Sequence, residues 1–307
     1  MADFAAGRLF ADQFIDYMNE SCTAFHAIEA SAKMLVDGGF VRLSEHTEWS
    51  LQKGGKYFFT RNTSALIAFT VGGTYEPGNG FTILGAHSDS PCLKIKPVTC
   101  SVKGDSLMLN TQPYGGGLWH TWFDRDLGLA GRIVYKESGS KDLKTKLIRI
   151  DKPIARIPNL AIHLTSGKER EGFSPNLQDH AKAILSMDPA LLAMKSSGTT
   201  EENDVDARLH PALVHLMSKE SGISTENIVD LELQLIDVQP SVIGGASEEL
   251  IFSGRLDNLC SSYQIMRALI DGSQENIGGQ PNVRMAMMFD HEEVQRYGNN
   301  IPPHEHI

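Results

Sequence analysis

The sequence has few cysteines, and their spacing excludes two kinds of site. Its 307 residues include four cysteines: Cys22, Cys92, Cys100 and Cys260. They form no C-x-x-C pair, so they predict neither a thiolate zinc site nor the dense disulfide framework of a small secreted protein. The first twenty residues lack the basic start and clean apolar core of a secretory signal. We therefore expect a cytoplasmic protein whose cysteines are reduced.

The chain also lacks a long apolar run and an excess of positive charge. No stretch approaches the roughly 18 consecutive apolar residues of a membrane-spanning helix. The 28 basic and 38 acidic residues give a net charge of −10, whereas a nucleic-acid-binding surface needs clustered Lys and Arg. These absences argue against a membrane or a nucleic acid as partner. With 41% apolar and 21% charged residues, the composition is that of a globular protein with a sizeable core.

The first third of the chain mixes helical and extended patterns. Apolar residues recur at helical spacing from Leu9 to Val36, and Asp37-Gly38-Gly39 ends that pattern as a C-cap does. Three short apolar runs typical of strands follow: 57–60, 65–70 and 81–86. The Gly- and Pro-rich residues 72–80 indicate a hairpin-like connection between the last two runs. Helices mixed with near-continuous apolar strands predict a layered α/β fold.

The middle of the chain has a different character. Residues 92–150 alternate short strand-like runs with Gly and Pro, and the polar residues 188–207 predict a solvated loop. Four further elements are expected: a helix at 211–219, a strand at 229–238, a helix at 257–270 and a buried strand at 283–289. A prior of one domain per ~150 residues predicts about two domains.

Two of the buried strands lead directly into ionisable side chains. After the run at 81–86 come His87 and Asp89, which lie on one side of an extended segment because they are two residues apart. A neutral histidine binds a divalent metal, and a neighbouring carboxylate fixes its tautomer. The strand at 283–289 leads into Glu292 and Glu293, where one carboxylate can bind a metal and the other can act as a general base. Position 295 is Gln, so the helical His-Glu-x-x-His zinc motif is not present.

A third acidic position, Asp257, begins the helix expected at 257–270. It either caps that helix or bridges two metal ions through its two carboxylate oxygens. Taken alone, the clusters at His87 and Glu292 favour a polar strand end and a charged loop over a metal site. In open α/β sheets, however, ligands bind at the carboxyl ends of the strands. The joint occurrence of the three clusters therefore predicts a metal site.

Six segments carry these clusters and the glycine-rich middle of the chain: Gly85–Pro91, Pro113–Trp119, Thr121–Leu127, Asn159–Leu164, Ser253–Asn258 and Phe289–Val294. In order and spacing they resemble the aspartyl aminopeptidase family, over residues 8–294. The resemblance implies an α/β catalytic domain with a central mixed sheet flanked by helices, at 1–91 and 240–307. It also implies an inserted β-rich dimerisation domain at 92–239. The implied activity is that of a dinuclear zinc exopeptidase removing N-terminal Asp or Glu from peptides.

The resemblance also assigns roles to single residues of the catalytic domain. His87 would be a zinc ligand, with Asp89 orienting it. Asp257 would bridge the two zinc ions. Glu292 would be the general base that takes a proton from the attacking water, and Glu293 would be a ligand of the second zinc ion. The chemistry is coherent because two cations lower the pKa of a shared water and hold the scissile carbonyl.

One further role falls in the inserted domain. By resemblance, His163 would reach into a neighbouring subunit's active site, where its N–H could stabilise the oxyanion of the tetrahedral intermediate. The family assembles through the insertion into dimers and then into a dodecamer, so the resemblance implies a homo-oligomer. From the residues alone, His163 is instead predicted to be a core histidine in an apolar strand.

After Val294 the sequence departs from the family pattern. The family continues with a Gly-Ser-rich loop, further metal ligands and an acidic-side-chain pocket, whereas this chain continues with residues 295–307. There His304 and His306 are possible ligands, but Pro302-Pro303 favours a mobile tail. We expect weak zinc binding and an incomplete catalytic sheet. Three functions stay open: a zinc aminopeptidase, a catalytically incompetent assembly partner, and another dizinc amide hydrolase.

Overall fold

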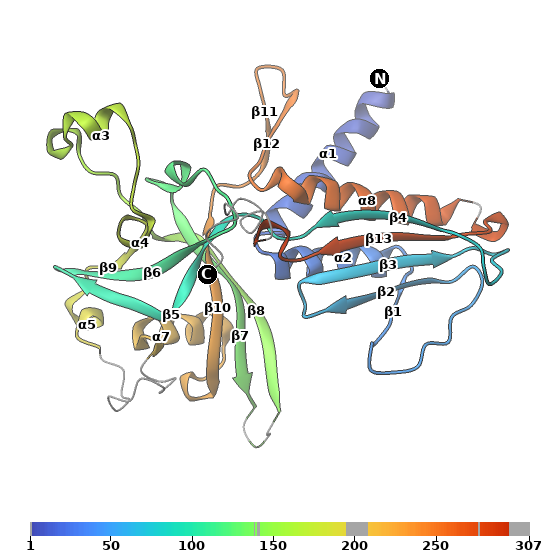
Figure 1. The fold of residues 1–307 in the computed structure, drawn as a ribbon, viewed down its shortest axis with the longest axis horizontal. Coiled ribbons are helices and arrows are strands. Elements are labelled where there is room, and N and C mark those ends of the chain that lie inside the picture. The colour runs from blue at the N-terminus through green and yellow to red at the C-terminus, as the bar shows by residue number, and fades with distance from the viewer. Residues whose placement is uncertain (1, 138, 140–141, 195–207, 276, 295–307) are drawn as a thin grey trace, which may run out of the picture. The chain divides into compact units, whose positions relative to one another are not determined.

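A computed structural model gives the fold, and it describes residues 2–137, 139, 142–194, 208–275 and 277–294 (Figure 1). The chain divides into two compact units. Unit 1 comprises Met1–Ser90 and Pro240–Ile307, and unit 2 comprises Pro91–Gln239. The candidate catalytic and metal-binding residues all belong to unit 1, apart from His163, which belongs to unit 2.

Unit 1 is built on a five-stranded mixed sheet in the order β1-β2-β3-β13-β4. Its strands are β1 (Val41–Arg42), β2 (Lys56–Arg61), β3 (Ala65–Val71), β4 (Phe81–His87) and β13 (Val283–Phe289). β4 runs parallel to β13, and β3 runs antiparallel to both β2 and β13. Alternate residues face opposite sides, so Phe58 and Leu66 join one core while Tyr57 and Phe69 join another.

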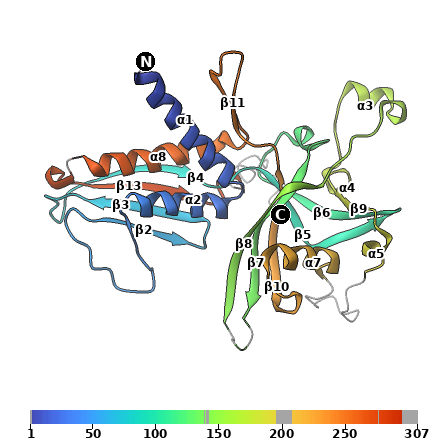
Figure 2. The ribbon, with the colours of Figure 1, turned by 180° about the vertical axis from the view of Figure 1, so that it is seen from behind.

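Two helices, α2 (Ala24–Asp37) and α8 (Leu256–Gln274), pack on one face of this sheet, and α1 (Ala2–Glu20) packs against both of them. Figure 2 shows α2 in front of the strands, on the side hidden in Figure 1. Tyr263 of α8 is fully buried, and its ring contacts Phe14 and Tyr17 of α1 at centroid distances of 5.3 and 5.2 Å. These rings share one buried core with Phe58 and Leu66 of the sheet, so burial of apolar and aromatic surface joins the helices to each other and to the sheet. The predicted α/β class is confirmed.

The helical pattern expected from Leu9 to Val36 is divided into two helices. The break falls at residues 21–23, where Thr23 has an extended backbone and its hydroxyl accepts a hydrogen bond from the His26 N–H at 3.3 Å. A short polar side chain at this position satisfies one of the free N–H groups that begin a helix. Apolar periodicity continues through the break, so it does not reveal the cap.

The prediction of a hairpin-like connection at residues 72–80, between β3 and β4, is wrong. β13, from much later in the chain, lies between β3 and β4, pairing Met285 with Phe69 on one side and with Ile83 on the other. Apart from Arg284, β13 is apolar on both faces, so a central position buries it best. The hairpin instead joins β2 to β3, through a turn in which Asn62 has a positive φ of 51°.

β4 forms one edge of the sheet among the described residues, and most of its apolar side chains are exposed. Phe81 and Ile83 keep 58% and 55% of their surface exposed, and Phe289 at the end of β13 keeps 49%. The edge strand carries no Lys, Glu or Pro. Such charged residues and prolines are what usually prevent an edge strand from pairing with another chain. The edge of β4 is therefore a surface that favours association.

We expect Ile83→Lys to reduce concentration-dependent association of the chain, because a charge on an edge strand opposes strand pairing. The measurement is the light-scattering mass over a range of protein concentrations. Val36→Lys on α2 is the matched control, because Val36 is similarly exposed, at 56%, but lies on a helix. Equal association of the parent and both variants would contradict the prediction.

Unit 2 contains a six-stranded antiparallel sheet in the order β8-β7-β10-β5-β6-β9. Its strands are β5 (Cys92–Lys103), β6 (Ser106–Tyr114), β7 (Leu127–Lys136), β8 (Leu143–Ala155), β9 (Ala183–Ser186) and β10 (Ile228–Asp237). The helix α7 (Pro211–Ser221) contributes Leu213 and Met217 to the core on this sheet. Unit 2 thus has a core of its own.

The strands of unit 2 are longer than the short runs expected within 92–150. Glycine does not interrupt β7, because it lets neighbouring strands approach closely. A Cβ at Gly131 would lie 2.0 Å from the Glu232 carbonyl oxygen, and one at Gly128 would lie 2.1 Å from the Ile150 carbonyl oxygen. Similarly, Pro97 lies within an irregularity of the β5–β6 pairing and does not end the strand.

The remaining elements are short: η1 (Trp119–Trp122), η2 (Ile162–Leu164), α3 (Gly167–Glu171), α4 (Leu177–His180), α5 (Pro189–Leu192), η3 (Thr225–Asn227), β11 (Val242–Gly244), β12 (Leu250–Phe252) and η4 (Ile277–Gly279). Most of the loop expected at 188–207, and the tail with His304 and His306, lie outside the described residues. A search of the described helices finds none with the length and apolarity to span a membrane.

Candidate metal centre

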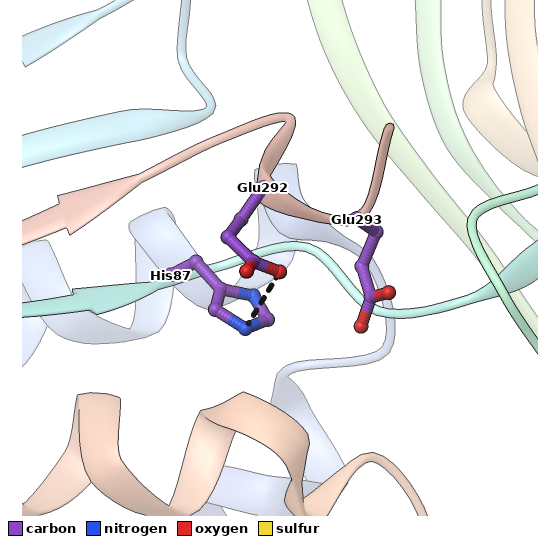
Figure 3. Close-up of side chains that lie close together, drawn as sticks. All are labelled: His87, Glu292 and Glu293. Carbon is purple, nitrogen blue, oxygen red and sulfur yellow. Dashed lines mark ion pairs between the residues drawn. The ribbon is translucent and has the colours of Figure 1, made fainter. Parts of the chain in front are cut away.

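The carboxyl ends of β4 and β13 bring three candidate ligands together (Figure 3). His87 is the last residue of β4, and Phe289, its partner in the parallel ladder, is the last residue of β13. Glu292 and Glu293 follow three and four residues later, so their side chains reach the space beside His87. One ligand atom from each of the three residues lies within 4.8 Å of the others. The sheet thus brings together three of the residues that the sequence analysis named as site candidates.

The imidazole of His87 is buried between carboxylates. Its Nδ1 lies 2.9 Å from the Asp89 backbone oxygen and 3.3 Å from Asp89 Oδ1. Its Nε2 lies 3.2 Å from Asp257 Oδ1 and 3.5 Å from Glu292 Oε2, and makes no hydrogen bond within the described residues. An Nδ1–H donated to Asp89 leaves the lone pair of Nε2 available beside these two carboxylates. That is the arrangement of a metal-binding imidazole.

The carboxylates also favour positive charge on the ring. Burial lowers the pKa of His87, but the hydrogen bond and negative charge of Asp89, with the charge of Glu292, outweigh burial and raise the pKa to about 9. The same field would stabilise a divalent cation beside Nε2, because cations and protons respond to the same potential. A bound metal and the proton on Nε2 would therefore compete for one position.

Asp89 does more than the orienting role predicted from the sequence. Its carboxylate is only 3% exposed. Oδ2 accepts a hydrogen bond from the Glu293 N–H at 3.1 Å, and Oδ1 lies 3.4 Å from the Glu292 nitrogen that donates to it. One buried carboxylate therefore contacts the ring of His87 and the backbone of both glutamates. Buried charge is costly unless it is paired and hydrogen-bonded, and these contacts provide the compensation.

Asp257 reaches the cluster from the start of α8. Its side chain is 58% exposed. Its backbone, at φ −85° and ψ 109°, is not helical, so the regular part of α8 begins after it. An extended backbone is also typical of an N-cap residue. The nearby Arg255 and His291 have positive φ values of 58° and 64°. Non-glycine residues rarely adopt this conformation outside functional sites and tight turns.

The donor set fits a zinc ion. It combines a buried imidazole nitrogen with the carboxylates of Asp257, Glu292 and Glu293, and nitrogen with carboxylate oxygen is a common zinc donor set. Glu293 is only 2% exposed, and a cation would stabilise such a buried carboxylate. This fit is supported by the buried Nε2 of His87, which lies close to the oxygens of Asp257 and Glu292 but makes no hydrogen bond within the described residues.

His163 is placed differently from these residues. It lies in unit 2 on η2, and its side chain is exposed. The prediction from the residues alone, a core histidine in an apolar strand, is therefore wrong. The apolar neighbours Ile162 and Leu164 are exposed as well, at 58% and 70%, which explains why hydrophobicity was misleading here. The cluster in unit 1 is built without His163.

Sequence reasoning missed a group of serines around the cluster. The Ser88 N–H donates to the Phe289 carbonyl at 2.7 Å, and its hydroxyl donates to the Ser64 carbonyl at 2.7 Å. Ser262 of α8 donates to the backbone of His87. Ser88 lies beside His87 in the sequence, which is a signal of proximity. Ser262 carried no signal, because only the packing of α8 on β4 brings it there.

Comparison with known proteins identifies similar chains. Residues 17–299 match a family model described as aminopeptidase I zinc metalloprotease (M18). The chain is 45% identical over 303 residues to a probable aspartyl aminopeptidase of Ricinus communis, a match that covers 91% of this chain and 61% of the relative. The chain thus spans about three fifths of the length of that curated relative.

Solved structures are similar as well. A cryo-EM structure of an Ape4 and Nbr1 complex matches with a TM-score of 0.83 and 37% identity, over 92% of this chain and 54% of that chain. The mApe1 dodecamer of S. cerevisiae matches with a TM-score of 0.77 and 27% identity, over 93% of this chain and 61% of that chain. Both structures share the mixed α/β architecture of this chain.

Proposed function

Since this chain belongs to the aminopeptidase I zinc metalloprotease (M18) family, we propose that it is a metallo-aminopeptidase that removes N-terminal Asp or Glu from peptides at a dinuclear zinc site in unit 1. The observation that carries the proposal is the buried His87 Nε2, which faces the carboxylates of Asp257 and Glu292 at 3.2 and 3.5 Å. The substrate preference is supported by the similarity to a probable aspartyl aminopeptidase.

The residues of the cluster divide the chemistry among them. His87, Asp257 and Glu293 would hold two zinc ions, with Asp257 between them. When bound, the ions supply positive charge that acidifies a water and polarises the scissile carbonyl. Asp89 keeps the proton of His87 on Nδ1, so that Nε2 is free to bind. Glu292 takes a proton from the attacking water and passes it to the leaving amine.

The proposal includes an assembly in which a second subunit contributes to the site. His163 lies on an exposed helical turn of unit 2, as a residue that serves a neighbouring subunit must. There its imidazole N–H would stabilise the oxyanion of the tetrahedral intermediate. A homo-oligomer formed through unit 2 is supported by the similarity to the mApe1 dodecamer. The cytoplasm, where the cysteines stay reduced, is the proposed location.

A second candidate function is a catalytically incompetent chain that acts only as an assembly partner. It is favoured by the number of ligands that the described residues bring together. Two four-coordinate zinc ions need several protein ligands each, whereas the cluster offers His87, Asp257 and Glu293 beside the proposed base Glu292. Unit 2, by contrast, has a six-stranded sheet and a core of its own.

Hydrolysis of a chromogenic amide of N-terminal Asp tests the proposed function. We expect the purified chain with added zinc to hydrolyse the Asp amide faster than the matching Leu amide. A chelator should remove this activity, because the ions supply the charge that activates the water. Soluble, folded protein without activity toward either amide would contradict the enzyme and favour the assembly partner.

A further inference from the structure

The backbone carbonyl of His87 has a partner outside the sheet. The Ser88 N–H donates to Phe289 on β13 at 2.7 Å. The carbonyl of His87 and this N–H belong to the same trans peptide group and point in opposite directions, so the carbonyl faces the other edge of β4. No strand pairs along that edge among the described residues. The hydroxyl of Ser262, which is fully buried on α8, donates to this carbonyl at 2.7 Å.

A second hydroxyl joins the same two segments in the opposite direction. Ser90, three residues after His87, donates its hydroxyl to the backbone carbonyl of Asp257 at 3.1 Å. Thus α8 holds the strand end through Ser262, and the strand end holds the start of α8 through Ser90. Between these two bonds, His87 Nε2 and Asp257 Oδ1 face each other at 3.2 Å.

We propose that Ser262 and Ser90 form a reciprocal clamp that sets the spacing of His87 and Asp257 for metal binding. The clamp rests on the proposed metal centre and adds two positioning residues to it. Both bonds attach to the backbone of a ligand residue, so each fixes the origin of a ligand side chain. A metal site needs its ligands held within about 0.5 Å, and rigid neighbours provide that precision.

The side chain of Ser262 does not touch the ligand atoms, so its effect passes through the backbone of His87. Its burial makes the bond difficult to replace, because water cannot reach the carbonyl once the hydroxyl is gone. Ser90 is half-buried, so water can replace part of its bond to Asp257. Removal of the Ser262 hydroxyl should therefore weaken metal binding more than removal of the Ser90 hydroxyl.

The experiment measures zinc affinity in the full chain by competition with a chromophoric chelator. The variants are Ser262→Ala and Ser90→Ala, with Ser273→Ala as the matched control. Ser273 also lies on α8, is 4% exposed, and donates within its own helix to the Ile270 carbonyl at 2.6 Å. We expect Ser262→Ala to weaken zinc binding about 10- to 100-fold, as loss of an outer partner of a metal ligand does. Ser90→Ala should weaken it less, and Ser273→Ala should retain the parent's affinity.

A spectroscopic readout separates positioning from stability. The visible absorption of bound Co²⁺ should change in Ser262→Ala, because the ligand spacing changes, and it should be unaltered in Ser273→Ala. Ser262→Thr keeps the hydroxyl, so its zinc affinity should be close to that of the parent. Should Ser262→Ala fail to fold, Ser90→Ala provides the test through the same two readouts.

Three outcomes would overturn the clamp. The first is parent-like zinc affinity and cobalt absorption in both Ser262→Ala and Ser90→Ala. The second is an equal loss in Ser273→Ala, which would make the effect a property of the helix. The third is a parent chain that binds neither zinc nor cobalt, and this result alone also overturns the proposed function.

Discussion

Glu292→Gln should lower kcat for the N-terminal Asp amide by about 10²- to 10⁴-fold, the usual contribution of a positioned general base. The amide of Gln has nearly the same shape as the carboxylate but cannot accept the proton of the attacking water. The three ligand residues that the proposal assigns, His87, Asp257 and Glu293, are unchanged. Zinc content should therefore stay close to that of the parent, and the loss should appear in kcat. Steady-state kinetics with a measurement of bound zinc tests both parts.

Glu29→Gln is the control for this substitution. Glu29 lies on α2 in the same unit, is exposed, and has no role in the proposed mechanism. Its activity should equal that of the parent. Retention of activity in Glu292→Gln would eliminate Glu292 as the base. Loss of zinc in parallel with activity would assign Glu292 to metal binding instead, which its distance of 3.5 Å from His87 Nε2 makes a definite alternative.

Asp89→Asn should weaken zinc binding by at least about 10- to 100-fold and loosen the segment after β13. The native carboxylate accepts from the Glu292 and Glu293 N–H groups and contacts the ring of His87. Asparagine replaces one acceptor oxygen with an NH₂ donor, so at least one buried N–H faces another donor. An unsatisfied buried group of this kind costs about 1–3 kcal/mol. The substitution therefore affects three residues of the site at once.

Two measurements test the Asp89 prediction. Zinc affinity reports on the position of the His87 imidazole. Hydrogen exchange reports on the bond from the Glu293 N–H to Asp89, and this amide hydrogen should exchange faster in the variant. Asp271→Asn is the control, because Asp271 is an exposed residue of α8 paired with Arg267 four residues earlier. Unchanged zinc affinity together with unchanged exchange at Glu293 would show that Asp89 does not hold the site.

The contacts of Asp89 show how far sequence reasoning reached. The spacing of His87 and Asp89 predicted a histidine oriented by a carboxylate, and the structure places Asp89 against Nδ1. No spacing rule connects Asp89 to the amides of Glu292 and Glu293, which lie 203 and 204 residues away in the chain. Those bonds arise because β4 and β13 are parallel neighbours whose ends meet at one edge of the sheet.

The unit 1 sheet shows the same division. The strand at 283–289 was predicted with its observed bounds, because a run that is apolar apart from Arg284 and lies between polar residues is a local property. Its position between β3 and β4 was not predicted, and a hairpin joining 65–70 to 81–86 was expected instead. Strand order depends on which neighbouring elements bury both faces of β13. Those elements come from both sequence segments of unit 1, so no local pattern reveals them.

The amino-acid sequence determined which residues could bind a metal and which ends of strands carry them, because residue type and hydrophobic periodicity are local. Only the tertiary structure decided that His87, Glu292 and Glu293 lie close together and that Asp257 approaches them from α8. It also decided that Ser262 donates a hydrogen bond to the backbone of His87. Such contacts depend on the pairing and packing of segments distant in the chain, and pairing is chosen by the burial of whole faces. The exposed His163 shows the same rule, since an apolar local run does not by itself place a residue in a core.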